Sequence, residues 1–285
     1  MKPKILVIVG PTASGKSALA IKLAKALAVE SEIVSADSRQ VYRDLDIGSG
    51  KVTKREMAGI PHHMLDIANP KRIFSVSQYQ KLAYKAIDNI ITRGKLPIIV
   101  GGTGLYVDAI TKNQIFPSVS PNPKLRKELE KLETKKLFQI LGKLDSERAR
   151  TIDRHNPRRL IRAIEIAKAI GKLPPPPVIH DRRKYVVTTI GIKVPPPDLR
   201  AKIHERLVKR MKAGMMTEIK NLHTGDLSWK RLEQLGLEYR YGALYLQGKL
   251  GRQEMLIKLE SKINHYAKRQ MTWFKRDKSI AWISP

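Results

Sequence analysis

Short apolar runs alternate with amphipathic stretches along the first hundred residues. Residues 4–9, 33–35 and 97–100 are rich in β-branched side chains and predict buried strands. Residues 17–28 consist of good helix formers, and residues 77–93 place apolar side chains at helical spacing. Because strands alternate with helices, we expect a parallel sheet with helices on both of its faces.

The pattern changes at about residue 117, where helical periodicity takes over and strand signals almost disappear. A well-bounded helix is predicted between Asn156, which can cap it, and Gly171, which ends it, with Pro157 at its first position. The run LPPPPVIHDRRKY at 173–185 then indicates an extended linker.

Beyond the linker the chain returns to sheet and helix. One strand and two long helices are predicted, at 185–194, 199–222 and 254–274. We therefore expect an α/β core made of residues 1–112 and 185–285, whose chain is interrupted by a helical insertion at 113–184.

The net charge of the chain indicates which kinds of binding partner it has. The 285 residues include 55 Lys and Arg against 26 Asp and Glu, which gives a formal charge of +29. Such an excess favours a polyanion, either nucleic acid or an anionic membrane, although a basic solubility surface or a Lys-rich thermophile is the alternative. Cysteine is absent, which excludes disulfides, thiolate chemistry and cysteine zinc sites. We find no signal peptide and no apolar stretch of membrane-spanning length, so we expect a soluble cytoplasmic protein with no membrane partner.

The stretch GPTASGKS at 10–17 matches the P-loop pattern, in which Gly10 and Gly15 are followed by Lys16 and Ser17. It lies between a predicted strand and a predicted helix, as the pattern requires, so a chance glycine-rich turn is the weaker alternative. Loop N–H groups would bind phosphate oxygens, Lys16 would add charge, and the Ser17 hydroxyl suits Mg²⁺. The fold class is therefore α/β, a P-loop NTPase-like parallel sheet flanked by helices, with a helical insertion domain. ATP, GTP and a prenyl diphosphate all fit such a loop.

Two further stretches follow predicted strands, where open α/β sheets bind ligands. Asp37 comes after the second strand, and its alternative role is to cap the next helix. In IIVGGTGLY, Gly101 and Gly102 allow close backbone approach and Thr103 offers a hydroxyl, although a tight turn would explain them equally.

Taken together, the motifs resemble the tRNA dimethylallyltransferases, also called tRNA isopentenyltransferases or the IPP transferase family. The matching stretches, in that family's order, are GPTASGKS, SADSRQVYRDLDIGSGK, GIPHHMLDI, FSVSQYQ, PIIVGGTGLY, NPRRLIRAIE, LGLEYR and KRQMTWFKRD. The resemblance implies transfer of a dimethylallyl group from dimethylallyl diphosphate to the exocyclic amine of the adenine next to the anticodon of tRNA. Two departures are Ser49-Gly50-Lys51-Val52, where the family has TAKP, and the proline run at 174–177.

The resemblance also implies residue roles. Asp37 would serve the amine as general base or as a hydrogen-bonding anchor, and Thr103 would hold the base or the diphosphate. Arg206, in Lys202-Ile203-His204-Glu205-Arg206, would supply a second cation. The diphosphate would bind Gly10, Pro11, Thr12, Ala13, Ser14, Gly15, Lys16 and Ser17, with Mg²⁺ on Ser17. The anticodon stem-loop would contact Asp37, Ser38, Arg39, Gln40, Thr103, Arg126, Arg158, Arg159, Arg162, Arg240, Lys268 and Arg269. For any single Arg or Lys of this set, an ordinary solvated charge is the alternative.

His62 and His63 suggest a metal site, but we expect a structural role near the sheet, since no further residue has zinc-ligand spacing. Three other functions stay open at this point. They are a prenyltransferase that acts on free adenine nucleotides, a P-loop kinase or ATPase, and a nucleic-acid-binding protein whose phosphate loop is inactive. We expect a monomer.

Overall fold

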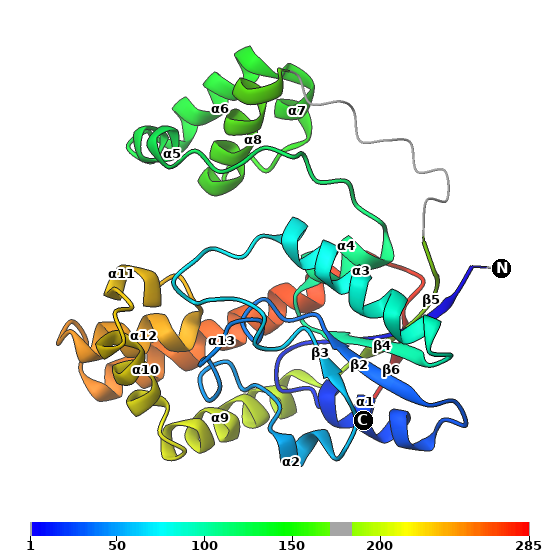
Figure 1. The fold of residues 1–285 in the computed structure, drawn as a ribbon. Helices are drawn as coiled ribbons and strands as arrows, with labels where there is room; N and C mark the ends of the chain where they lie inside the picture. Colours follow the sequence, from blue (N-terminus) through cyan, green and yellow to red (C-terminus); the bar gives the residue numbers. More distant parts are fainter. Residues whose placement is uncertain (1, 172–183, 285) are drawn as a thin grey trace. The chain divides into compact units, whose positions relative to one another are not determined.

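The computed structural model of the chain describes residues 2–171 and 184–284, and Figure 1 shows its fold. In this part of the chain six strands form one sheet in the order β3-β2-β4-β1-β5-β6, and all neighbouring strands are parallel. The strands are β1 Lys4–Val9, β2 Ser31–Ser35, β3 His62–His63, β4 Leu96–Gly101, β5 Val186–Ile192 and β6 Ala281–Ile283. The predicted α/β fold class is confirmed.

Both faces of the sheet are covered, which is why its two central strands, β1 and β4, are mostly apolar. Ile8, Ile33 and Ile98 pack under α1 (Lys16–Ala26), whereas Val7 and Ile99 pack on the opposite side. Figure 1 shows α3 (Val76–Thr92) and α4 (Gly104–Thr111) on that second face. The sheet is therefore a rigid platform between two helical layers.

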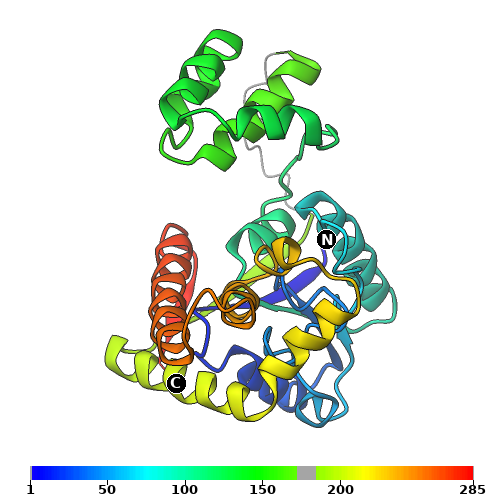
Figure 2. The same ribbon diagram turned by 90° about the vertical axis from the view of Figure 1, so that its left-hand side faces the viewer.

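A group of helices completes the core unit. The helices are α2 Lys54–Met57, α9 Pro196–Lys212, α10 Met215–Thr224, α11 Trp229–Leu232, α12 Leu237–Leu246 and α13 Arg252–Phe274. α13 packs against α9 and α12, and α10 packs against α9 and α12, as Figure 2 shows. The single helix predicted at 199–222 is wrong, because Gly214 adopts a left-handed conformation with φ of 97° and separates α9 from α10.

The chain divides into two compact units, Met1–Gln114 with Arg183–Pro285, and Ile115–Arg182. The second unit contains α5 Pro123–Leu129, α6 Thr134–Leu144, α7 Ser146–Thr151 and α8 Pro157–Ile170, and the sequence predicts bounds of 113 and 184 for it. Leu137, Leu141, Leu160 and Ile164 form the centre of its own core. As predicted, the Asn156 side chain caps α8 by accepting the Arg159 N–H at 3.2 Å. The predicted extended linker and its proline run fall mostly on residues 172–183 and lie outside the described residues.

Within the part of the chain that the structure describes, no helix is both apolar and long enough to cross a membrane.

Candidate active site

The loop after β1, residues 10–15, leads into the start of α1 and forms a cradle where backbone N–H groups can bind a phosphate. Gly10 has φ of 152°, and a Cβ there would meet the Ile192 carbonyl oxygen at 2.9 Å, so only glycine fits. Gly15 has φ of 86° and precedes Lys16, the first residue of α1. The Ser14 hydroxyl is 2% exposed and has no hydrogen-bond partner within the described residues. A buried hydroxyl of this kind calls for an external partner, and a phosphate oxygen supplies one.

Two cations converge on this cradle. Lys16 Nζ donates to the Pro11 carbonyl at 2.6 Å, and Arg206 Nη1 from α9 reaches the Thr12 hydroxyl at 3.4 Å. Burial and the positive charge of Arg206 lower the pKa of Lys16 to about 7, against the opposing influence of Asp37. Burial and Arg210 likewise lower the pKa of Arg206 to about 10. Two half-buried cations that lie this close together favour a strongly anionic ligand, even though Asp37 partly offsets their charge.

Gln270 was not predicted as a site residue, yet it ties the cradle to the neighbouring loop. Its Oε1 accepts the Thr12 N–H at 2.8 Å, and its Nε2 donates to the Gly102 carbonyl at 2.9 Å. The side chain is 6% exposed on the otherwise apolar face of α13 that includes Ala267 and Phe274. A polar residue on such a face is a signal that the sequence does contain.

Asp37 and Thr103 lie together at the carboxyl ends of β2 and β4. The Ser38 N–H donates to Thr103 Oγ1 at 3.1 Å, and Thr103 Oγ1 donates to Ser38 Oγ at 3.3 Å. Asp37 Oδ1 accepts the Arg39 N–H at 2.8 Å and the Gln40 N–H at 3.4 Å. The helix-cap alternative for Asp37 fails, since these residues form a turn and no helix follows.

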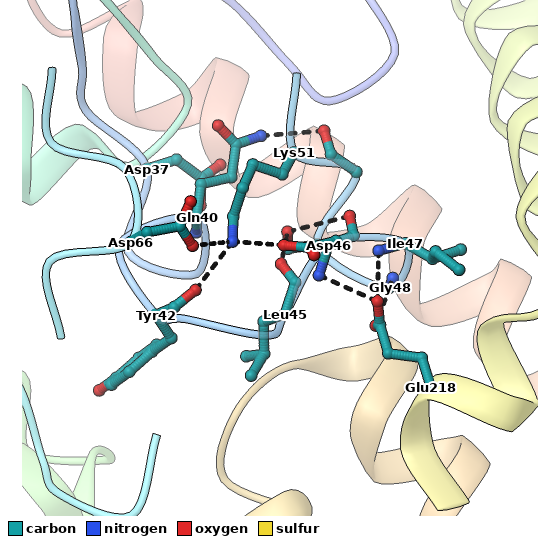
Figure 3. Close-up of polar contacts among 12 residues, drawn as sticks. Asp37, Gln40, Tyr42, Leu45, Asp46, Ile47, Gly48, Lys51, Asp66 and Glu218 are labelled. Atoms are coloured by element: carbon teal, nitrogen blue, oxygen red, sulfur yellow. Dashed lines mark hydrogen bonds and ion pairs between the residues drawn. The ribbon is translucent and has the colours of Figure 1, made fainter. Parts of the chain in front are cut away.

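The loop of residues 46–51 contacts both Gln40 and Arg206, and Figure 3 shows the hydrogen bonds that hold it. Lys51 Nζ donates to the Tyr42 carbonyl at 2.9 Å and to Asp46 at 2.6 Å, and it also pairs with Asp66. Gly50 has φ of 60°, and a Cβ there would collide with the guanidinium groups of Arg206 and Arg210. Gly50, where the family pattern has alanine, thus leaves room for both cations.

The predicted tRNA-facing arginines of the insertion differ in their surroundings. Arg158 and Arg159 are exposed on α8. Arg126 pairs with the buried Glu165 at 2.7 Å, and Arg162 pairs with the same carboxylate. Burial would raise the pKa of Glu165, but hydrogen bonds from Arg126, the Asn122 N–H and Arg162 lower it to about 2. Two of the predicted tRNA-facing arginines, Arg126 and Arg162, therefore also neutralise a buried acid.

The remaining predicted contacts lie in the core unit. Lys268 and Arg269 are exposed on α13. Arg39 Nη1 donates to the Gln234 carbonyl at 3.3 Å, and Arg240 Nε donates to the Glu233 carbonyl at 3.0 Å.

The two histidines line the edge of the sheet. His63 Nε2 contacts Glu32, which is 2% exposed, at 2.7 Å, and Arg93 pairs with the same carboxylate. His62 Nδ1 contacts the Ile60 carbonyl, and burial lowers its pKa. Residues 2–171 and 184–284 contain no cluster of three His, Asp or Glu that could hold a metal ion.

Ser17, at the start of α1, is exposed at one side of a small cavity that Ser35, Gln40 and His62 also line. A hydroxyl in this place suits Mg²⁺ only if a bound diphosphate supplies further oxygens, because Mg²⁺ takes six oxygen ligands and keeps several waters. The residues present therefore fit a metal that arrives with an anionic ligand.

Comparisons with known proteins agree on one family. The family model described as IPP transferase matches residues 40–277. A relative named tRNA dimethylallyltransferase 2, from Trichlorobacter lovleyi, is 43% identical over 97% of this chain and 90% of its own length. The crystal structure of the full-length tRNA isopentenylpyrophosphate transferase of Bacillus halodurans is 36% identical, with a TM-score of 0.74 over 99% of this chain and 90% of that one. A eukaryotic dimethylallyltransferase, described as acting on tRNA, is 25% identical with a TM-score of 0.82, covering 99% of this chain and 74% of that one.

Proposed function

The chain belongs to the IPP transferase family, as the resemblance of its motifs predicts, and from this premise we propose that it transfers a dimethylallyl group from dimethylallyl diphosphate to tRNA. The acceptor is the exocyclic amine of the adenine next to the anticodon. The observation that carries the proposal is the pairing of a doubly cationic phosphate cradle with a carboxylate and a hydroxyl at the same edge of the sheet.

The donor half of the site stabilises a leaving group. During transfer the bond between C1 of the dimethylallyl group and the diphosphate oxygen breaks, and the diphosphate leaves with the electron pair. Lys16, Arg206 and the loop N–H groups face the oxygens on which the negative charge grows. Mg²⁺ held by Ser17 and the donor's own oxygens would supply additional positive charge there.

The acceptor half positions the amine and takes its proton. The adenine has to leave the stacked loop of the tRNA before its amine can reach C1. Thr103 and Ser38 present hydroxyls, and Gln40 an amide, that suit the edge of the flipped base. When the amine nitrogen bonds to C1, Asp37 accepts the proton that the amine loses.

The whole constellation lies in one chain, so the proposal needs only a monomer. We place the protein in the cytoplasm, where its tRNA substrate resides.

The test is incubation with labelled dimethylallyl diphosphate and bulk tRNA in the absence of ATP. Label that enters tRNA supports the proposal. Label that enters AMP or ADP but no tRNA supports the free-nucleotide prenyltransferase instead. Phosphate transfer that requires ATP supports a kinase or ATPase, although β4 runs into Gly101-Gly102-Thr103 rather than into an acidic residue. A protein that binds tRNA but transfers no label from the diphosphate would contradict the assignment.

Salt tests the tRNA surface of the insertion. Each phosphate neutralised adds about 0.7 to 0.9 to the slope of log affinity against log salt. Changing Arg158 and Arg159 to Ala is expected to flatten that slope by about one to two units. We choose Arg158 and Arg159 rather than Arg162, because Arg162→Ala would also remove an ion-pair partner from the buried Glu165.

Filter-binding titrations at several salt concentrations measure that slope. The matched control changes Lys22 and Lys25, two exposed lysines of α1, to Ala. A slope that stays unchanged in the Arg158 and Arg159 variant places the tRNA elsewhere on the molecule.

The pKa of Lys16, about 7, predicts proton uptake when the donor binds. Below pH 7 the free protein already carries the Lys16 proton, so binding adds little. At pH 8 the lysine is mostly neutral in the free protein, and a bound diphosphate raises its pKa, so close to one proton is taken up. Calorimetry of pyrophosphate binding in buffers of different ionisation enthalpy measures this number. Lys16→Arg is the control because arginine keeps its charge at both pH values, and equal uptake by both proteins contradicts the prediction.

A further inference from the structure

Three consecutive backbone N–H groups of the 46–51 loop point at one carboxylate (Figure 3). Glu218 of α10 accepts the Asp46 N–H at 3.0 Å and the Ile47 N–H at 2.6 Å through Oε2, and the Gly48 N–H at 3.0 Å through Oε1. Bonds from backbone N–H groups to an ionised carboxylate are short and stronger than neutral ones. Glu218 therefore fixes the first half of the loop against a helix that is about 170 residues away in the chain.

Tyr239 extends this anchor. Its hydroxyl donates to Glu218 Oε1 at 2.8 Å and accepts the Ser49 N–H at 3.1 Å. The tyrosine is 1% exposed, and a Cβ on Gly48 would meet its ring at 2.6 Å, so the loop backbone packs directly on the ring. The second half of the loop is fixed separately by Lys51.

While Glu218 and Tyr239 bind the N–H groups of residues 46–49, the carbonyls of Gly48 and Gly50 face the site. The Gly50 carbonyl accepts Gln40 Nε2 at 3.0 Å and Arg206 Nη2 at 3.3 Å. The Gly48 carbonyl accepts Arg210 Nη1 at 3.2 Å. One carbonyl thus contacts both an amide from the acceptor half and a cation from the donor half.

We infer that Glu218 is a positioning residue for prenyl transfer, which orients Arg206 by anchoring the 46–51 loop. The inference rests on the proposed function. Arg206 and Arg210 lie close enough for Arg210 to lower the pKa of Arg206, so the two cations repel each other. Glu238, which pairs with Arg210 at 2.8 Å, offsets part of that repulsion, and the fixed carbonyl dipoles of the loop offset more of it as long as the loop does not shift.

Glu218→Gln tests this role with little change in size. The amide keeps one acceptor oxygen but places an NH₂ group, which is itself a donor, against backbone N–H donors. We expect the loop to shift by a fraction of an ångström to about 1 Å. Misplacement on that scale lowers the donor kcat/KM by about 10- to 100-fold. Affinity for tRNA is expected to change less than about twofold, because Glu218 contacts no proposed tRNA residue directly.

A double-mutant cycle with Arg206→Ala separates positioning from a general structural effect. If Glu218 acts through Arg206, Glu218→Gln in the Arg206→Ala background costs less than about threefold in single-turnover rate and in pyrophosphate affinity. Losses that multiply in full, or a wild-type rate for the single variant, overturn the inference. The matched control is Glu205→Gln, an exposed acid of α9 that pairs only with Lys209 in the described structure and is expected to keep wild-type rates.

Tyr239→Phe keeps the packed ring and removes both hydroxyl contacts, so it tests the anchor even where Glu218→Gln fails to fold. We expect Tyr239→Phe to lower the donor kcat/KM by about 3- to 10-fold. In the Arg206→Ala background this loss is expected to become smaller, as for Glu218→Gln. A Tyr239→Phe enzyme with unchanged donor kinetics contradicts the inference. These outcomes are distinct from a failure of the proposed function, in which the wild-type protein itself would transfer no label to tRNA.

Discussion

Lys16→Ala is expected to lower single-turnover prenyl transfer by about a thousandfold, to background, and to leave tRNA affinity nearly unchanged. Removing one group that stabilises developing negative charge typically costs 10²- to 10³-fold, and Lys16 is expected to carry a full charge beside the cradle once the diphosphate is bound. A thousandfold loss corresponds to about 4 kcal/mol of transition-state stabilisation. Affinity for tRNA depends on many exposed cations, so the loss of one half-buried lysine changes it little.

The control for this variant is Lys22→Ala, which removes an exposed lysine from the same helix. Transfer is measured with enzyme in excess and both substrates saturating, and tRNA affinity is measured separately by filter binding. If Lys16→Ala transfers at the wild-type rate, the cradle does not hold the donor. If Lys22→Ala loses as much as Lys16→Ala, a general loss of positive charge explains the result.

The centre of the fold could be predicted from the sequence because its signals are local. β1 and β4 are covered on both faces, so residues 5–9 and 96–100 form uninterrupted apolar runs. β3 was missed because it contains only His62–His63, and β6 because its three residues are partly exposed at the sheet edge. The break between α9 and α10 was missed because Ile203 and Leu207 before it and Ile219 after it continue one helical periodicity, although Gly214 marked the place.

The candidate site likewise contains residues that local sequence signals predict and residues that they do not. The phosphate loop, Asp37 and Thr103 each follow a strand, so a rule about strand ends places them at one edge. Gln270 and Glu218 contact residues 168 and 170 positions away, so the sequence can mark Gln270 as a polar residue on an apolar helix face but cannot identify the partner of either residue. Arg162 is an intermediate case. Glu165 lies three residues after it on the same helix face, so the sequence did contain the competing ion pair.

The role of Asp37 separates chemistry from binding. Its Oδ1 accepts two backbone N–H groups, from Arg39 and Gln40, while its Oδ2 receives no hydrogen bond from the described part of the chain. In Asp37→Asn the amide oxygen can keep both backbone contacts, so the turn is expected to survive. The amide cannot accept the amine proton. General-base catalysis contributes about 10²- to 10⁴-fold, so single-turnover transfer is expected to fall by that amount.

Although Asp37→Asn is expected to lose transfer activity, its affinity for pyrophosphate is expected to stay the same or rise. Asp37 lies close enough to Lys16 to raise the pKa of the lysine, so its negative charge also opposes a bound diphosphate. Loss of that charge in Asp37→Asn tightens pyrophosphate binding slightly or leaves it unchanged. The matched control is Asp198→Asn, an exposed acid in the first turn of α9, which is expected to keep the wild-type rate. Single-turnover transfer with both substrates saturating decides the matter. An Asp37→Asn enzyme that stays active shows that the carboxylate only shapes the turn, whereas one that loses transfer while binding both substrates identifies Asp37 as the proton acceptor.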